Sequence, residues 1–148
     1  MNLFSLLSVS ASGMSAQRAR SEVMVENLAN AETTRTPGGG PYRRKDVVFQ
    51  TAPQVSPFSD VWSEELGLSG EVVNGVEVSE VVTDTRDPEK RYLPGHPDAD
   101  AQGYVAFPRV NPAEDMVELM SASRGFQANV SAMAAVKDML YRSVDLLK

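Results

Sequence analysis

The sequence has no cysteine and only one histidine, His96, in 148 residues. Without cysteine there are no disulfides and no thiolate metal ligands. His96 lies in a turn rich in proline and glycine. No second histidine is present to complete a metal site, and a serine triad would have to use this turn residue as its base. The paired carboxylates Glu64 and Glu65 stand among polar residues, which do not provide the apolar setting that a carboxyl acid catalyst needs. We therefore predict that the chain is not an enzyme and has no catalytic residue, metal, cofactor or small-molecule substrate.

Aromatic and basic residues are also scarce. The aromatic share is 7% and the formal net charge is -6. Few aromatic rings disfavour a deep ring-walled ligand pocket, and an acidic chain repels the phosphates of nucleic acid. The one basic cluster, residues 43–45, is interpreted as a solvated turn. Nucleic acid is therefore not expected as a partner.

Long apolar runs are missing as well. No stretch approaches the length of a membrane span. The apolar start, residues 1–7, has no basic residues before it and no clear small-residue cleavage site after it. We therefore expect no cleaved Sec signal, so that any export must follow another route.

What is present falls into three regions: an N-terminal helix over 1–31, a β-rich and loop-rich middle over 32–111, and a C-terminal helix over 112–148. The middle region holds all but one of the prolines and most of the β-branched pairs. We predict an α+β fold in which residues 1–31 and 112–148 pair as an antiparallel coiled coil and form one helical domain.

The C-terminal helix has the clearest pattern. Asn111 is a good N-cap and Pro112 fits the first helical position. From Met116 onward, apolar residues recur at alternating spacings of three and four, which is typical of a coiled-coil seam. The N-terminal helix has a more mixed seam interrupted by Gly13, and it is the only partner within the chain. A plain helical hairpin over a small β domain would fit the same pattern.

Three strands are expected in the middle region. Residues 45–51 and 103–107 have strand composition, and Asn74-Gly75 between β-branched residues indicates a hairpin turn followed by a strand to about Thr83. Residues 88–97 are turn-rich, and residues 52–70 show no periodicity.

Several motifs resemble a known family. Residues 26–31 read ENLANA, which is similar to the NLANA signature of bacterial flagellar rod and hook proteins. Four further segments resemble the proximal-rod members of that family: PYRRKDVVFQ at 41–50, GYVAFPRV at 103–110, EDMV at 114–117 and MSASRGFQANV at 120–130. The resemblance covers both ends and leaves residues 52–80 unmatched. Gly125 and Phe126 depart from it, because the family often has a small or polar residue and then tyrosine there.

The resemblance implies a structural subunit of the basal-body rod, whose terminal helices line a hollow shaft that transmits torque across the periplasm. It implies export through the flagellar type III apparatus without signal cleavage. The implied partners are other rod proteins, an export-gate adaptor and the inner-membrane ring, joined in a multi-subunit helical structure. The alternative is a cytoplasmic coiled-coil adaptor or chaperone-like oligomer.

The resemblance also gives roles to single residues. Asn27 and Asn30 would end the first helix and bind backbone or neighbours, while Arg124, Gln127 and Asn129 would make polar contacts between helices. Together, the helix seams and the family motifs predict these subunit-interface residues: Leu3, Leu7, Met14, Met24, Asn27, Leu28, Asn30, Met116, Leu119, Ser123, Arg124, Phe126, Gln127, Asn129, Val130, Met133, Leu140 and Val144.

Overall fold

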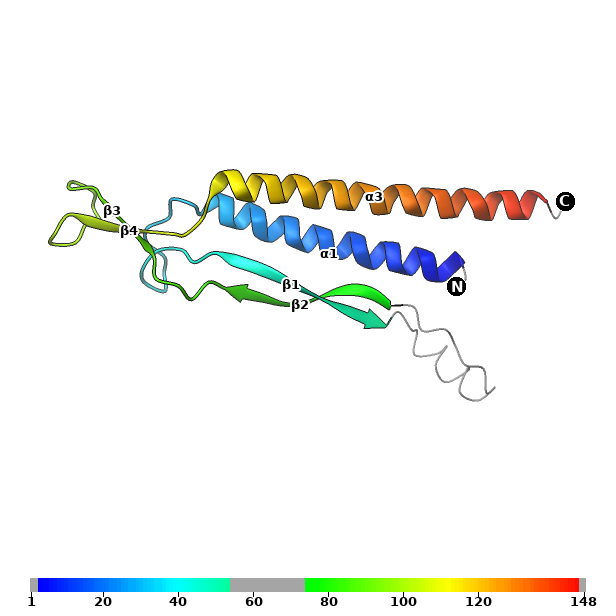
Figure 1. Cartoon of the computed structure of the whole chain (residues 1–148), viewed down its shortest axis with the longest axis horizontal. Coiled ribbons are helices and arrows are strands. Elements are labelled where there is room, and N and C mark those ends of the chain that lie inside the picture. The colour runs from blue at the N-terminus through cyan, green and yellow to red at the C-terminus, as the bar shows by residue number, and fades with distance from the viewer. Residues whose placement is uncertain (1–2, 54–73, 147–148) are drawn as a thin grey trace. The chain divides into compact units, whose positions relative to one another are not determined.

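The computed structural model describes residues 3–53 and 74–146 (Figure 1). Two long helices enclose two small sheets in the order of the chain, so the predicted α+β class is confirmed. The elements are α1 (Leu3–Ala29), β1 (Lys45–Pro53), β2 (Asn74–Thr83), β3 (Glu89–Tyr92), β4 (Tyr104–Phe107) and α3 (Pro112–Asp145). Neither long helix in these ranges is apolar enough over a sufficient length to cross a bilayer.

The ends of both helices follow from local side-chain chemistry. At the start of α3, the Asn111 side-chain oxygen accepts a hydrogen bond from the Ala113 backbone N–H at 3.2 Å, as predicted for an N-cap. At the end of α1, the Glu26 carbonyl accepts hydrogen bonds from both the side-chain amide and the backbone N–H of Asn30, at 2.9 and 3.1 Å. Gly13 does not interrupt α1, which runs through it without a break.

The first sheet pairs β1 with β2, and Figure 1 shows the two strands running in opposite directions. The strand predicted from residue 45 is confirmed, as is the strand that continues to Thr83. The hairpin turn predicted at Asn74-Gly75 is wrong, because both residues already belong to β2. Residues 71–73, on the other side of that predicted turn, lie outside the described residues.

The second sheet is the antiparallel pair β3 and β4, in which Tyr92 lies opposite Tyr104. The strand expected at residues 103–107 is confirmed as β4, whereas β3 lies in a segment expected to be only turns. All four β3 residues are exposed, so the strand has no alternation of apolar and polar residues that a sequence pattern would reveal. The two tyrosine rings meet edge to face at 5.4 Å, and Gly103 takes a φ of 83° beside them.

The chain divides into two compact units, and each contains parts of both helices and of the β region. One unit comprises residues 1–18, 49–79 and 123–148, and the other comprises residues 19–48 and 80–122. We refer to them as unit 1 and unit 2. In unit 1, the Val76 backbone N–H donates to the Ser12 hydroxyl at 3.1 Å, which ties β2 to α1. In unit 2, the ties between helix and strand are more numerous and form the cluster described below.

The core is small and contains polar side chains. The largest fully buried side chains are Val105, Asn27 and Asp115, of which only the first is apolar. Along α3, the buried or half-buried positions form one stripe that mixes polar, small and large apolar residues: Asp115, Glu118, Leu119, Ala122, Gly125, Asn129, Met133, Val136 and Leu140.

The apolar seam predicted for α3 coincides with that buried stripe at Leu119, Met133 and Leu140. Four other seam residues, Met116, Phe126, Val130 and Val144, are between 39% and 55% exposed. The pairing of this seam with α1 as a coiled coil stays a prediction. The stripe also contains Ala122 and Gly125, which are small enough to let a neighbouring backbone come close.

Candidate functional site

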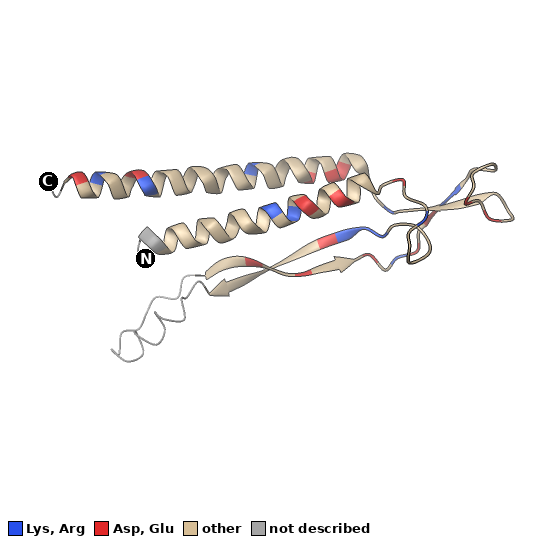
Figure 2. Cartoon of the chain, turned by 180° about the vertical axis from the view of Figure 1, so that it is seen from behind, with Lys and Arg blue, Asp and Glu red and all other residues tan. Residues whose placement is uncertain are grey.

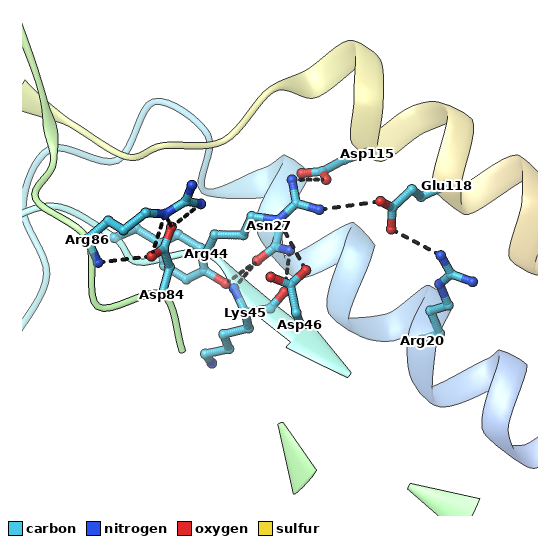
Figure 3. A network of polar contacts seen from close by, with 10 residues as sticks. Arg20, Asn27, Arg44, Lys45, Asp46, Asp84, Arg86, Asp115 and Glu118 are labelled. Atoms are coloured by element: carbon cyan, nitrogen blue, oxygen red, sulfur yellow. Dashed lines mark hydrogen bonds and ion pairs between the residues drawn. The ribbon is translucent and has the colours of Figure 1, made fainter. Parts of the chain in front are cut away.

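A polar cluster lies where α1, β1 and the start of α3 meet in unit 2 (Figure 3). Asn27, on α1, is fully buried at its centre. Its amide donates to the Lys45 carbonyl at 2.8 Å and accepts from the Lys45 backbone N–H at 2.9 Å. One side chain thus pairs with both backbone groups of a strand residue, as a neighbouring strand would. Asn27 therefore fixes α1 against the first residue of β1.

Tyr42 completes the hydrogen bonding of Asn27. Its hydroxyl donates to the same Asn27 oxygen at 2.9 Å, and its ring is buried. Burial, together with the nearby carboxylates of Glu26 and Asp115, raises the pKa of Tyr42 to about 12. The hydroxyl is therefore protonated throughout the physiological range and acts as a hydrogen-bond donor.

Arg44, the residue just before β1, takes part in ion pairs that connect this strand with both helices. Its side chain is only 11% exposed, and Nη1 lies 2.8 Å from Oδ1 of the fully buried Asp115. Neither Asp115 oxygen accepts a well-oriented hydrogen bond from a described residue, so proximity of opposite charges holds this pair. Nη2 of Arg44 lies 3.6 Å from Glu118, which is also 3.3 Å from Arg20 on α1. Alternating charges therefore connect Arg44, just before β1, with Glu118 on α3 and Arg20 on α1.

Burial dominates the electrostatics of Asp115. It raises the pKa of this carboxyl, and Arg44 opposes the rise. Asp115 also stands in the first turn of α3, where the helix dipole favours negative charge. A buried ion pair of this kind adds little net stability but strongly disfavours any arrangement in which one partner is left alone. The cluster therefore selects one packing of the two helices on the strand.

In unit 1, α1 and α3 contact each other through two glycines and two amides. A methyl group added at Gly13 would lie 3.0 Å from Nδ2 of Asn129, and one added at Gly125 would lie 3.2 Å from Cδ of Gln17. In each helix the glycine precedes the amide by four residues, so both lie on one face. Each glycine thus makes room for the amide of the opposite helix. This reciprocal contact fixes which residues of α1 and α3 lie together.

The predicted interface residues divide into three groups by burial. Met24 and Asn27 are buried; Leu7, Met14, Leu28, Asn30, Leu119, Asn129, Met133 and Leu140 are half-buried; and Met116, Ser123, Arg124, Phe126, Gln127, Val130 and Val144 are exposed. The side chain of Leu3 lies outside the described residues. The structure brings Asn27 into the polar cluster and Asn129 into the glycine–amide contact.

Sequence reasoning missed most of the polar cluster. The basic run 43–45 is not simply a solvated turn, since Arg44 is largely buried and Lys45 pairs with Glu26. Asp115 resembled an ordinary first-turn acid, and only its place one residue before the apolar seam hinted at burial. His96 has the local role expected of a turn residue, because its Nδ1 accepts a hydrogen bond from the Asp98 backbone. In the described ranges, no cluster of histidine and acidic side chains is arranged to hold a metal ion.

Comparison with known proteins defines the class. Residues 101–146, which include β4 and α3, match the family described as flagellar basal body rod FlgEFG protein C-terminal. Together with the α+β fold built on two terminal helices, this match defines a structural protein of the flagellar basal-body rod.

The relatives specify the member of that class. The flagellar basal-body rod protein FlgC of Bacillus subtilis is 42% identical over 100% of this chain and 100% of its own. FlgC of Borreliella burgdorferi is 37% identical over 100% of this chain and 99% of its own, and FlgC of Salmonella typhimurium is 39% identical over 99% and 98%. The chain belongs to the FlgC family and is a structural subunit of the basal-body rod.

Proposed function

We propose that this subunit assembles into the rod through α1 and α3, which pair as an antiparallel coiled coil, and that the exposed apolar side of α3 contacts neighbouring subunits. The observation that carries the proposal is the absence of charged residues from α3 over residues 125–136 (Figure 2). Phe126 and Val130 are exposed in this stretch. Residues 3–17 of α1 are likewise uncharged. Two uncharged helix segments suit burial inside an assembly.

The pairing of the helices is supported by contacts in each unit taken separately. In unit 1 Gly13 meets Asn129 and Gln17 meets Gly125, so positions ascend along one helix as they descend along the other. In unit 2, Arg20 of α1 forms its ion pair with Glu118 of α3. Within such a pair, the buried and half-buried stripe of α3 faces α1, and the exposed apolar residues remain available to other subunits.

The finer features of the function follow the family. The rod is a hollow shaft that transmits torque across the periplasm, and this subunit reaches it through the type III export apparatus without a cleaved Sec signal. Its neighbours are sibling rod proteins, the export-gate adaptor and the inner-membrane ring. Its terminal segments, residues 1–31 and 112–148, act as one helical assembly domain, and the chain has no catalytic role. A cytoplasmic adaptor is disfavoured, because the relatives described above are rod proteins over nearly their whole length.

The test introduces a charge into the apolar side of α3. Val130→Lys is expected to lower the amount of the chain in detergent-extracted basal bodies more than about tenfold, because a buried unpaired charge costs several kcal/mol. The matched control is Ser121→Lys, at an exposed position of the same helix outside the uncharged stretch. Quantitative mass spectrometry of basal bodies and swimming in soft agar give the readouts. Equal incorporation of the two variants would contradict the proposed face, and a wild-type chain absent from basal bodies would contradict the rod function.

A further inference from the structure

Unit 2 contains a small pocket beside the polar cluster. It has a volume of about 80 Å³ and is lined by the turn at residues 39–44 together with Asp84, Arg86, Pro88 and Arg109. Gly39 and Gly40 adopt φ values of 85° and 77°, which close the turn tightly over the pocket. The volume holds a few waters or one side-chain headgroup, and it is much smaller than the sites that enclose whole small-molecule ligands.

Arginine dominates the pocket wall. Arg43, Arg44, Arg86 and Arg109 all line it, and Asp84 is its one carboxylate. Arg44 is engaged by Asp115, Asp46 and Glu118, and Arg86 by Asp84. Arg43 donates to the Asp84 backbone carbonyl at 3.0 Å, a contact that leaves its charge uncompensated. In the described part of the chain, Arg43 and Arg109 belong to no close ion pair, and four arginines face one carboxylate, so the pocket carries an excess of positive charge.

The positive charge around the pocket stabilises the charged form of Asp84. Its carboxylate accepts hydrogen bonds from both the side chain and the backbone of Arg86, and its side chain is only 12% exposed. These bonds, with a further contribution from the charge of Arg109, lower the pKa of Asp84 to about 2. One carboxylate is thus held firmly in its charged form at the pocket, and guanidinium groups remain to bind another.

A neighbouring hollow of about 430 Å³ shares Arg44, Arg86 and Arg109 with this pocket. Its wall also carries three carboxylates, of which Asp46 and Glu89 already have arginine partners. An arriving anion is therefore favoured on the side of the small pocket, where Arg43 lies and Asp84 is the single acid.

We propose that this arginine pocket binds a carboxylate side chain of an adjacent copy of the same chain, and so sets the contact between copies in the rod. The inference rests on the proposed rod function. Guanidinium groups match carboxylates in planar, two-bond geometry, so the pocket recognises an Asp or Glu headgroup rather than an apolar one. A pocket on one copy that receives a group from a different surface of the next makes a heterologous contact, which generates helical assemblies.

The chain itself supplies suitable carboxylates. It carries 20 acidic against 14 basic residues, so a concentrated positive pocket is the exception on its surface. The exposed acids Glu32, Glu80, Asp87 and Asp138 take part in no ion pair within the described ranges. Because copies with a net charge of -6 repel each other, a specific arginine–carboxylate contact offsets that repulsion at one defined place.

The experiment uses basal bodies from cells that carry the Arg109→Lys chain. This substitution keeps the charge and provides an amine that a carbodiimide joins directly to a carboxylate in contact with it. The expected product is a covalent dimer of this chain, in which mass spectrometry finds position 109 linked to an acidic peptide of a second copy. The matched control is Arg91→Lys, since Arg91 is exposed and already pairs with Glu89. It should give no such dimer.

Three results would overturn the proposal: a link from position 109 only to its own chain, a link to a different rod protein, or equal dimer formation by the control. A second measurement covers failure of the cross-linking chemistry. Arg43→Glu combined with Arg109→Glu is expected to reduce incorporation into basal bodies at least tenfold, whereas Arg91→Glu leaves it unchanged. Equal incorporation of these variants would also overturn the proposal. Absence of the wild-type chain from basal bodies would instead refute the rod function on which the proposal rests.

Discussion

At the scale of single residues, the most specific feature is the use of buried polar groups in place of a large apolar core. Asn27 satisfies both backbone groups of Lys45, and Arg44 partners a carboxylate that has no contact with solvent. Such groups stabilise the fold only when every partner is in place, so they penalise incorrect packing more than they add net stability.

Asn27→Ala tests the hydrogen-bond centre. It leaves the Lys45 backbone N–H and carbonyl and the Tyr42 hydroxyl without their partner, so the free energy of unfolding should fall by about 3 kcal/mol. Urea denaturation followed by circular dichroism measures this loss. The control Tyr42→Phe removes one of the three bonds and should cost about 1 kcal/mol. Equal losses for the two variants would show that the two hydrogen bonds from Asn27 to the Lys45 backbone add no stability.

The Arg44–Asp115 ion pair predicts that substitutions of its two side chains are coupled in their effect on stability. Arg44→Gln leaves the Asp115 charge buried alone and should cost about 3 kcal/mol at neutral pH. Adding Asp115→Asn should restore most of that loss, because the stranded charge is gone. Additive losses in the double variant would rule out coupling between the two side chains.

The raised pKa of Asp115 fixes the sign of the pH effect. The folded chain holds this proton more tightly than the unfolded chain, so the stabilisation from protonation is complete below the unfolded value of 3.8 and is lost as pH rises through the folded pKa. The destabilisation caused by Arg44→Gln alone should therefore shrink on acidification from neutral pH toward 4, as urea titrations at several pH values would show. A loss that stays constant with pH would contradict this assignment.

At the scale of elements, the sequence predicted the helices and strands that apolar periodicity and capping residues encode. It failed for features that depend on contacts with other elements. The Asn111 cap placed the start of α3, and β-branched runs placed β1, most of β2 and β4. The strand β3 was not predicted because its residues are all exposed. The turn predicted at Asn74-Gly75 is wrong because pairing of β2 with β1 overrides the turn preference of these residues. The inner stripe of α3 was predicted at Leu119, Met133 and Leu140 but missed at Ala122 and Gly125, because small residues give no hydrophobic period.

The glycine–amide contact is the element-scale feature that mutation tests most directly. In an exposed helix, Gly13→Ala would raise stability by about 1 kcal/mol through helix propensity. Here the added methyl group meets the Asn129 amide at 3.0 Å, and that amide is held by its hydrogen bond to the Gly125 carbonyl, so the substitution should instead destabilise the chain. When Asn129→Ala is made first, the clash disappears and Gly13→Ala should become stabilising. A sign that is the same in both backgrounds, measured by thermal unfolding, would refute the contact.

At the scale of the whole molecule, the described residues leave many large apolar side chains exposed. They recur along α3 from Met116 and Val117 to Val144, and Leu146, just after the helix, is 87% exposed. Large exposed apolar patches mark sites of association in soluble proteins. The family assignment and these exposed side chains together support the proposal that α3 contacts other subunits.

This conclusion predicts how trypsin cuts the free and the assembled chain. In the purified chain, the exposed sites Lys137 and Arg142 near the end of α3 should be cut first, and Arg44, which is only 11% exposed and held by ion pairs, should be cut last. In isolated basal bodies, cleavage at Lys137 and Arg142 should slow by more than about tenfold, equivalent to about 1.4 kcal/mol of added local stability.

Arg91, on the exposed strand β3, is the internal reference, because its cleavage does not depend on the helices. Mass spectrometry of timed digests ranks the sites in both samples. If Lys137 and Arg142 are cut at the same rate relative to Arg91 in the free and assembled chains, α3 gains no protection on assembly and its apolar side is not a subunit interface.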